Sequence, residues 1–298
     1  MIWPFGVPKQ RFGEYHAVRL LHQGEKSVVY LAEPPGGPGG SVAIKLYRPQ
    51  YDRFARRLEE KHGIPSEAEV GRRLSPKTPA EVPDYPIVTT KSEGREFGRR
   101  TGSRYVVLEY VEGVSLKSLI SCRDPRVSAR RVAFPADCCR ALGIIHAAGF
   151  VCRDFGSQNL MVQPSGRLKL LDLGFVAPAG MAFPERSGTP PYMSPEQVAA
   201  QPLTPASDIY ALGIVLYEII TGSLPYVSAI TGEDLESLEA RRKEVMQMHL
   251  ERPAPEFAES VRRRSPRLCA IATQCLQKDP AARFQSAEEL LAALKYPK

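Results

Sequence analysis

The spacing of hydrophobic residues changes once along this chain of 298 residues, close to Gly113. Before that point the apolar runs are short, and charged or Gly/Pro-rich segments separate them, as is typical of β-strands. The runs are YHAVRLL, VVYLAE, SVAIKLY, YPIVTT and RYVVLEYVE. A helical segment around residues 66–74 lies between the third and fourth runs, and EPPGGPGGS is typical of a hairpin loop. This part of the chain therefore predicts a small β-rich lobe over about residues 14–110.

After Gly113 the pattern becomes helical. The stretch RVAFPADCCRALGIIHAAG repeats small or apolar residues at spacings of four and three, which predicts one face of a helix. That face consists of Val132, Ala136, Cys139, Gly143 and His146. A second stretch, SDIYALGIVLYEIITG, is apolar on nearly every side and is expected to lie inside a helical lobe. We therefore expect an α+β, bilobal architecture with an N-terminal tail at 1–13, a hinge at 109–113 and a larger α-helical C-lobe at about 114–298.

Composition restricts the class of protein. Hydrophobic residues make up 43% of the chain and charged residues 24%, as in ordinary globular proteins. The formal net charge is +7, and basic clusters occur at 56–57, 72–73, 99–100 and 262–264. We interpret these clusters as solvated faces, together with a site for an anionic ligand, rather than as a nucleic-acid surface.

Targeting signals and cysteine pairs are not evident. The chain contains no run of 18 apolar residues, and MIWPFGVPKQR has neither a basic leader nor an apolar core, so a cytoplasmic protein without a transmembrane segment is expected. The six cysteines form no CxxC pair and are expected to be reduced, mostly buried thiols rather than zinc ligands.

Several polar side chains stand where a nucleotide could be bound. In SVAIKLY, Ala43 and Lys45 share one face of the predicted strand, and Glu67 on the following helix could hold the lysine ammonium. Further along, VCRDFGSQNL and LKLLDLGF place Asp154, Asn159 and Asp172 within a short stretch. Two carboxylates and an amide are hard oxygen ligands suited to Mg²⁺ and a polyphosphate.

These motifs, in this order, resemble those of the eukaryotic-like protein kinases that bacteria carry, over about residues 14–294. The resemblance implies that Lys45 contacts the α/β-phosphates and that Glu67, with Glu69 as the near alternative, is its helix partner. It implies Asp154 as the catalytic base, with Asn159 and Asp172 as Mg²⁺ ligands. For ATP it further implies Gly24 in the phosphate loop, Val29, Ala43 and Met161 around the adenine, and the backbone of Glu109 and Val111 at the hinge. Outside the site it implies an ion pair between Glu196 and Arg283 and an Asp208 that braces the catalytic loop.

The chain departs from the family pattern at several positions. His22 and Ser27 replace glycines of the phosphate loop, and Gly156 stands where Ser/Thr kinases usually carry a lysine. By analogy with other anion-stabilising groups, such a loss can cost about 2.7–4 kcal/mol in the barrier. Gly71 replaces a bulky apolar residue, Cys152 replaces a histidine and Leu173 replaces a phenylalanine. These three substitutions remove contact area, so the helix that bears Glu67 is expected to be loosely held.

Three further expectations concern the catalytic loop, CRDFGSQN at residues 152–159, and the activation segment, residues 172–196. Cys152 replaces the usual histidine and is interpreted as a packed thiol rather than a redox sensor. Ser187 is a candidate phosphorylation site that Arg153 would bind, and Glu185 could supply a weaker constitutive charge.

The predicted function is ATP-dependent phosphorylation of Ser/Thr in proteins, with ATP and Mg²⁺ as cofactors, low turnover because of Gly156, and self-association as a route to autophosphorylation. Ser/Thr is preferred to Tyr because GTPPYMSPE resembles the bacterial Ser/Thr enzymes. Two alternatives stay open at this stage. One is a pseudokinase that acts as a nucleotide-binding interaction module, and the other is a small-molecule kinase of the same fold.

Overall fold

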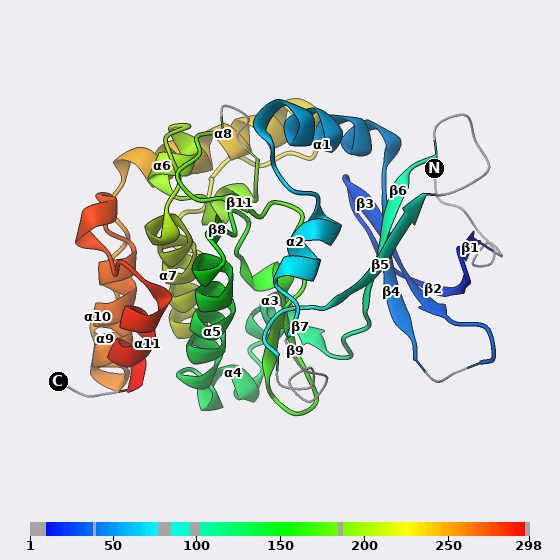
Figure 1. The fold of residues 1–298 in the computed structure, drawn as a ribbon. Helices are drawn as coiled ribbons and strands as arrows, with labels where there is room; N and C mark the ends of the chain where they lie inside the picture. Colours follow the sequence, from blue (N-terminus) through cyan, green and yellow to red (C-terminus); the bar gives the residue numbers. More distant parts are fainter. Residues whose placement is uncertain (1–9, 38–39, 77–84, 96–101, 184–186, 296–298) are drawn as a thin grey trace. The chain divides into compact units, whose positions relative to one another are not determined.

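The computed structural model describes residues 10–37, 40–76, 85–95, 102–183 and 187–295 (Figure 1). The chain divides into two compact units, the first extending to Glu112 and the second beginning at Gly113. Each unit has its own helices, strands and buried core.

The first unit is built on one antiparallel sheet of six strands, in the order β1-β2-β3-β4-β6-β5. The strands are β1 (Arg11–Phe12), β2 (Tyr15–Gln23), β3 (Ser27–Glu33), β4 (Val42–Tyr47), β5 (Thr90–Arg95) and β6 (Arg104–Glu109). Alternation in β4 points Val42 and Ile44 into the core, where both are fully buried. The same core contains Phe12, Ala32, Tyr105 and Val107.

Two expectations about this sheet need correction. Part of the segment expected to be a tail is strand β1, because Phe12 is only 1% exposed and packs against the rings of Tyr30 and Tyr105. The strand that was expected across the run YPIVTT is β5, and it begins at Thr90, the last residue of that run. The apolar residues Ile87 and Val88 of that run are buried but lie outside the strand. Their apolar character alone therefore suggested a strand there.

Two helices follow β4: α1 (Pro49–His62) and α2 (Glu67–Arg73). Helix α2 falls inside the predicted segment 66–74, and the side chain of Ser66 caps it by accepting from the backbone N–H of Glu69. Helix α1 was not expected, because it is mostly polar and buries only Asp52 among its residues. Ion pairs attach it to the sheet, since Arg104 of β6 donates to Asp52 and also pairs with Glu59. In addition, the ring of Tyr51 lies 6.0 Å from that of Tyr47 on β4.

The second unit is mainly helical (Figure 1). Its helices are α3 (Leu116–Ser121), α4 (Pro125–Ala129), α5 (Ala133–Ala147), α6 (Pro195–Val198), α7 (Pro205–Thr221), α8 (Leu235–Glu251), α9 (Glu259–Arg264), α10 (Pro266–Cys275) and α11 (Ala287–Lys295). Two small sheets complete it: β10 (Leu168–Leu170), β9 (Leu160–Val162) and β7 (Val114–Ser115) form one, and β11 (Ala177–Pro178) with β8 (Phe150–Val151) form the other. None of the described helices is long and apolar enough to cross a bilayer.

Helices α5 and α7 lie side by side in the core of this unit (Figure 1). Helix α7 is buried from Ala206 to Ile219 and ends at Gly222, whose φ of 82° is the left-handed cap that glycine adopts most readily. This agrees with the all-round apolar pattern. In α5 the expected face is only partly right: Ala136 and Cys139 are buried, but Val132 is 44% exposed. Helices α7 and α11 and strands β8 and β10 all contact α5, so its buried surface is wider than one stripe.

Candidate active site

The first set of polar groups lies in the first unit, on β4 and α2. Nζ of Lys45 lies 3.0 Å from Oε1 and 2.9 Å from Oε2 of Glu67, and both residues are 8% exposed. Glu69 instead pairs with Arg73 on the solvent side of the helix. The structure therefore selects Glu67 from the two candidate partners of Lys45. A residue that the sequence reasoning missed, Tyr47, also donates its hydroxyl hydrogen to Oε2 of Glu67.

Gly71 is what brings this helix close to the sheet. A Cβ atom built at Gly71 would lie 1.8 Å from Oγ1 of Thr90 on β5, which is far inside any permitted contact. Helix α2 is thus packed closely against β5 at Gly71, and the expectation that this helix is loosely held stays a prediction. The missing side chain removes contact area but allows a closer approach, and dense packing replaces the lost bulk.

The turn between β2 and β3 is the predicted phosphate loop. Its single glycine, Gly24, donates its N–H to the carbonyl of Ser27 at 2.9 Å, and its own carbonyl accepts from Nε of Arg48 at 2.9 Å. The turn is therefore closed by its own backbone and braced by an arginine. Ser27 is buried and His22 is exposed, so the two residues that replace glycines face different surroundings.

The residues predicted to surround the adenine are found in both units. Val29 and Ala43 are half-buried on β3 and β4, and Glu109 and Val111 lie at the end of β6 and just after it. The N–H of Glu109 donates to the carbonyl of Thr89, and its carboxylate accepts from the N–H and hydroxyl of the same threonine. Met161 lies on β9 of the second unit and is half-buried.

The second set of polar groups lies between β8 and β11 in the second unit. Nδ2 of Asn159 donates to the carbonyl of Asp154 at 2.9 Å and to its Oδ2 at 3.3 Å. The N–H of Leu171 donates to the carbonyl of Asn159 at 2.9 Å, so the residue that precedes Asp172 is tied to the loop. Oδ1 of Asp172 accepts from the N–H of Gly174 at 2.8 Å. These bonds bring together the three residues that the sequence analysis selected.

Asp208, near the start of α7, binds the backbone of the catalytic loop through its carboxylate. Its carboxylate accepts from the N–H of Cys152 at 2.7 Å and of Arg153 at 3.0 Å, and Nε2 of His146 lies 2.8 Å from Oδ2. Arg153 adopts a φ of 67°, a left-handed conformation that costs energy for a residue with a side chain. The two backbone bonds to Asp208 stabilise this conformation, which sets the direction of the next residue, Asp154.

Gly156 lies in a crowded part of this loop. Its backbone is extended, and a Cβ there would lie 2.6 Å from Oε1 of Gln158 and 2.9 Å from Cδ2 of Tyr192. Beside it, the hydroxyls of Ser157 and Tyr192 are 2.8 Å apart, and Tyr192 donates to Glu218 at 2.8 Å. Burial raises the pKa of the Tyr192 hydroxyl and also that of the Glu218 carboxyl. The space that a side chain at residue 156 would need is thus partly filled by neighbours.

Arg153 already has a partner in the activation segment. Its guanidinium carbon lies 3.5 Å from the ring centroid of Phe183, and the residue is only 7% exposed. Stacking of a buried guanidinium on an aromatic face is a strong form of the cation–π contact. Ser187 has its carbonyl bonded by Nε2 of Gln197, while Glu185 lies outside the described residues. The phosphorylation of Ser187 stays a prediction, and Phe183 is a residue that the sequence reasoning missed.

The buried ion pair predicted between Glu196 and Arg283 is present. Nη1 and Nη2 of Arg283 lie 2.7 Å and 2.9 Å from the two carboxylate oxygens of Glu196, a bidentate arrangement. The arginine also donates to the carbonyls of Ala206, Gln277 and Lys278. Together these bonds join helix α6 to the turn before α11.

The cysteines are free, and five of the six are buried. Burial, with the Asp208 carboxylate nearby, raises the pKa of Cys152 well above its usual value, and the residue is 1% exposed. Such a thiol stays protonated and is poorly reactive, which confirms the packed interpretation. Burial likewise raises the pKa of Cys139 to about 12.

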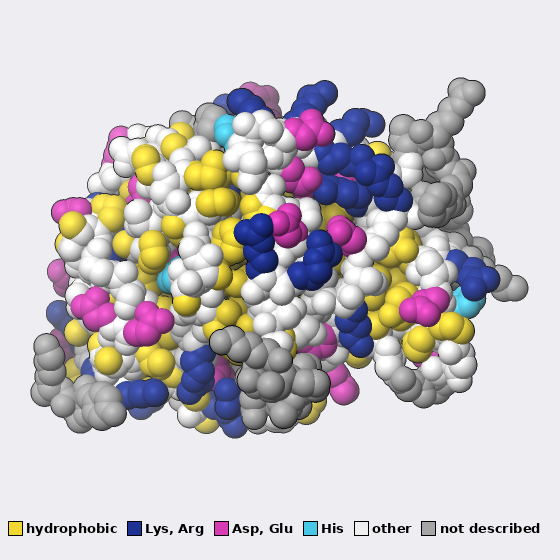
Figure 2. All heavy atoms as spheres, viewed as in Figure 1, with side chains coloured by type: hydrophobic (Ala, Val, Ile, Leu, Met, Phe, Trp, Pro, Cys, Tyr) yellow, Lys and Arg dark blue, Asp and Glu magenta, His cyan; other side chains and the backbone are white. Residues whose placement is uncertain are grey.

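Most of the basic clusters are paired with acids, and all of these acids except Asp52 are exposed or half-buried. Figure 2 shows Lys and Arg side chains interspersed with Asp and Glu over the face that it presents. The pairs are Arg56 with Asp52, Arg72 with Glu93, Arg73 with Glu69, and Arg262 and Arg263 with Glu259. Residues 99–100 lie outside the described residues. This pairing agrees with the interpretation of the clusters as solvated faces.

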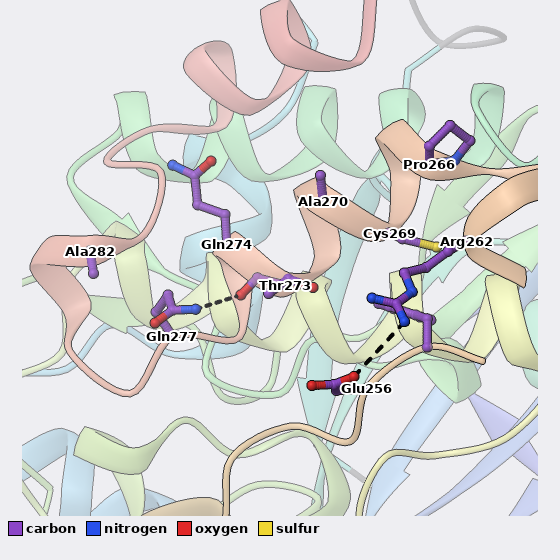
Figure 3. Close-up of a pocket in the computed structure, with 10 residues that line it drawn as sticks. Glu256, Arg262, Pro266, Cys269, Ala270, Thr273, Gln274, Gln277 and Ala282 are labelled. Atoms are coloured by element: carbon purple, nitrogen blue, oxygen red, sulfur yellow. Dashed lines mark hydrogen bonds and ion pairs between the residues drawn. The ribbon is translucent and has the colours of Figure 1, made fainter. Parts of the chain in front are cut away.

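A surface pocket lies on α9 and α10, and none of the residues that line it belongs to either polar set (Figure 3). Its polar groups are directed at one another: Arg262 lies 4.0 Å from Glu256, and Nε2 of Gln277 donates to the carbonyl of Thr273 at 3.1 Å. The other residues that line the pocket are mainly apolar, among them Phe257, Pro266 and Ala270. The pocket offers no arrangement suited to catalysis.

Comparison with known proteins identifies the family. The sequence of residues 15–294 matches the family described as the protein kinase domain, so the chain belongs to the protein kinase family. The chain is 34% identical to serine/threonine-protein kinase PknB of Mycobacterium tuberculosis over 197 residues, or 64% of this chain and 30% of that protein. It is 32% identical to serine/threonine-protein kinase PknD of the same organism over 291 residues, or 95% of this chain and 39% of that protein.

A third relative is the serine/threonine-protein kinase drp72 of Corynebacterium efficiens, 30% identical over 295 residues, or 96% of this chain and 52% of that protein. The regions of similarity thus span between 30% and 52% of the lengths of these three relatives. The matches agree with the predicted bilobal α+β kinase fold.

Proposed function

We propose that this chain transfers the γ-phosphate of ATP to serine and threonine side chains of proteins. The proposal treats residues 14–298 as one kinase domain with a hinge at 109–113. It assigns ATP positioning to Lys45 and Glu67, and the catalytic base to Asp154. The observation that carries the proposal is the buried ion pair of Lys45 and Glu67, in which Nζ lies 2.9 Å from Oε2. Burying two charges costs desolvation free energy, and the pair is therefore best explained by a function, which is to present the lysine ammonium to an anionic ligand.

Chemically, the proposed step needs little from the protein beyond positioning and charge. Asp154 orients the substrate hydroxyl and accepts its proton while the oxygen attacks the γ-phosphorus and ADP leaves. Gly24, the half-buried Val29, Ala43 and Met161, and the backbone of Glu109 and Val111 are the proposed contacts of the nucleotide. Phosphoryl transfer of this kind relies on electrostatic stabilisation rather than covalent help.

The residues proposed for the metal fit a hard divalent cation. Because Nδ2 of Asn159 donates to Asp154, the amide oxygen is the atom of that side chain left to act as a ligand. The carboxylate of Asp172 adds charged oxygens, and oxygen-only donors of this kind suit Mg²⁺. When bound, the cation would neutralise charge on the phosphates.

The preference for Ser/Thr rests on two supports. The three relatives described above are named serine/threonine-protein kinases. In addition, Thr189 of the GTPPYMSPE segment lies within hydrogen-bond reach of the catalytic loop, since its Oγ1 is 3.3 Å from Nε2 of Gln158. We further propose a cytoplasmic location, and self-association as the route to autophosphorylation.

Turnover is expected to be slow because Gly156 supplies no cation at the position that a lysine usually holds. Gln158 lies beside Gly156 and bonds to Thr189, but it carries no charge. Loss of one charge-stabilising group corresponds to about two to three decades in rate.

The test is transfer of radiolabelled phosphate from ATP and Mg²⁺ to general protein substrates, with the Asp154→Asn variant beside the wild type. Wild type should label serine and threonine at a rate at least about 100-fold above the variant. Asp234→Asn is the matched control, since Asp234 is an exposed helix cap and asparagine caps equally well.

Two other outcomes would contradict the proposal. Equal labelling by wild type and Asp154→Asn, together with a higher melting temperature in Mg-ATP, would indicate a nucleotide-binding module. ATP consumption that an aminoglycoside or sugar stimulates and protein does not would indicate a small-molecule kinase.

A further inference from the structure

The ion pair of Lys45 and Glu67 contains a third member, Tyr47. The tyrosine hydroxyl donates to Oε2 of Glu67, the same oxygen that lies 2.9 Å from Nζ of Lys45. Lys45 and Tyr47 are two residues apart on β4, so the period of the strand places both side chains on one face. Tyr47 is 6% exposed, and Lys45 lies 5.7 Å from the centroid of its ring.

The ring of Tyr47 is itself held by α1 and β6. The guanidinium carbon of Arg104 lies 5.8 Å from the ring centroid, and that arginine is bonded to Asp52 and Glu59 of α1. The ring of Tyr51, also on α1, lies 6.0 Å away. Tyr47 thus links the helix that the sequence reasoning missed to the carboxylate of Glu67.

We propose that Tyr47 is a positioning residue that fixes the carboxylate of Glu67, and through it the ammonium of Lys45, for binding of the ATP phosphates. This inference deepens the proposed function and rests on it. A phenol bears no charge at neutral pH, so it can hold the carboxylate without neutralising it. The attraction between Glu67 and Lys45 therefore keeps its full strength.

The need for such a residue follows from the chemistry of the lysine. When phosphates attract Lys45, the attraction between Lys45 and Glu67 weakens, and the carboxylate of Glu67 is held less firmly in its rotamer. A second donor, from a side chain that packing has locked, keeps the carboxylate in place at small entropic cost. Hydrogen bonds to charged groups are also stronger than neutral ones.

The test compares Tyr47→Phe with Tyr105→Phe. Tyr105 is a matched control because it is 7% exposed in the same sheet, and no hydrogen bond of its hydroxyl is found among the described residues. Tyr47→Phe should raise both the KM for ATP and the Kd for Mg-ATP about tenfold, with kcat falling less than about threefold, because ground-state positioning is lost. Tyr105→Phe should leave all three within about twofold of wild type.

The coupling to Glu67 provides a readout that a merely structural role would not change. In a Glu67→Ala background, Tyr47→Phe should alter the Kd for Mg-ATP by less than about twofold, because the acceptor is already gone. If Tyr47→Phe melts well below the wild type, replacement of Tyr47 by 4-aminophenylalanine, which keeps an N–H donor, should restore both melting temperature and Kd. Restored melting without restored Kd would overturn the proposal.

Failure of this inference is distinguishable from failure of the proposed function. A wild type that transfers phosphate, with Tyr47→Phe indistinguishable from Tyr105→Phe, overturns the role of Tyr47 alone. A wild type that binds Mg-ATP without transfer overturns the enzymatic function, and the Kd values still decide on Tyr47. A wild type that binds no Mg-ATP overturns both.

Discussion

Removal of Glu196 should destabilise the second unit strongly, because it leaves a buried guanidinium without its counter-charge. The side chain of Arg283 is fully buried and that of Glu196 is 5% exposed. Breaking a buried pair by deleting one partner costs about 3–5 kcal/mol, of which the stranded charge is the main part. The three carbonyls that also accept from Arg283 solvate it only in part. We therefore expect Glu196→Ala to lose about 3–5 kcal/mol of the free energy of unfolding.

The measurement is urea denaturation followed by circular dichroism, with Glu259→Ala as the control. Glu259 pairs with Arg263 at 3.6 Å, but these side chains are 61% and 75% exposed, so deletion should cost less than about 1 kcal/mol. A double variant, Glu196→Gln with Arg283→Met, should be more stable than Glu196→Ala, because no charge is left buried. A loss below about 1 kcal/mol for Glu196→Ala would refute the view that the buried charge dominates the cost.

The same pair predicts a dependence on pH. Burial alone would raise the pKa of Glu196, but the hydrogen bonds and charge of Arg283 outweigh it, and the pKa in the folded protein lies below the usual value of 4.5. The stability from this ionised group is therefore complete above that usual value and is lost as pH falls through the lowered pKa. Urea titrations between neutral and acidic pH should show a smaller acid-induced loss in Glu196→Gln than in wild type.

Three further outcomes follow from the packing. Gly71→Ala should destabilise the first unit by about 1–3 kcal/mol, seen as a lower melting temperature, because the new methyl group would overlap Thr90. In the native protein a thiol reagent should modify Cys122 first, as the one exposed cysteine, and mass spectrometry after limited alkylation checks this. Phe183→Ala should make limited proteolysis of the activation segment about 30-fold faster, because the stacking on Arg153 that it removes contributes about 2 kcal/mol. Phe183→Tyr keeps an aromatic ring and should not change the rate.

Local patterns in the sequence predicted much of the fold. The period of two in SVAIKLY indicated which side chains of β4 share a face, and the all-round apolar stretch indicated that α7 is buried. Patterns of this kind work because burial on one side requires a fixed spacing of apolar residues, whatever the partner. Helix α1 escaped detection for the same reason, since ion pairs with Arg104, rather than an apolar face, attach it to the sheet.

The candidate site shows a similar division. Motif order selected Lys45, Asp154, Asn159 and Asp172, because the resemblance to protein kinases supplied their roles before any contact was known. The sequence favoured Glu67 and left Glu69 as the near alternative, since both stand in the first turn of α2. The structure shows that Glu67 pairs with Lys45 and that Glu69 pairs with Arg73.

What the sequence determined by itself is the family, the succession of strands and helices, and the types of residue that could bind a nucleotide. Only the tertiary structure decided that Tyr47 bonds to Glu67, that Gly71 seats α2 against Thr90, and that Arg153 stacks on Phe183. The physical reason is that these contacts join residues that are far apart in the chain, or depend on the direction in which a side chain points. Close packing in three dimensions, rather than the spacing of residues along the chain, selects such contacts.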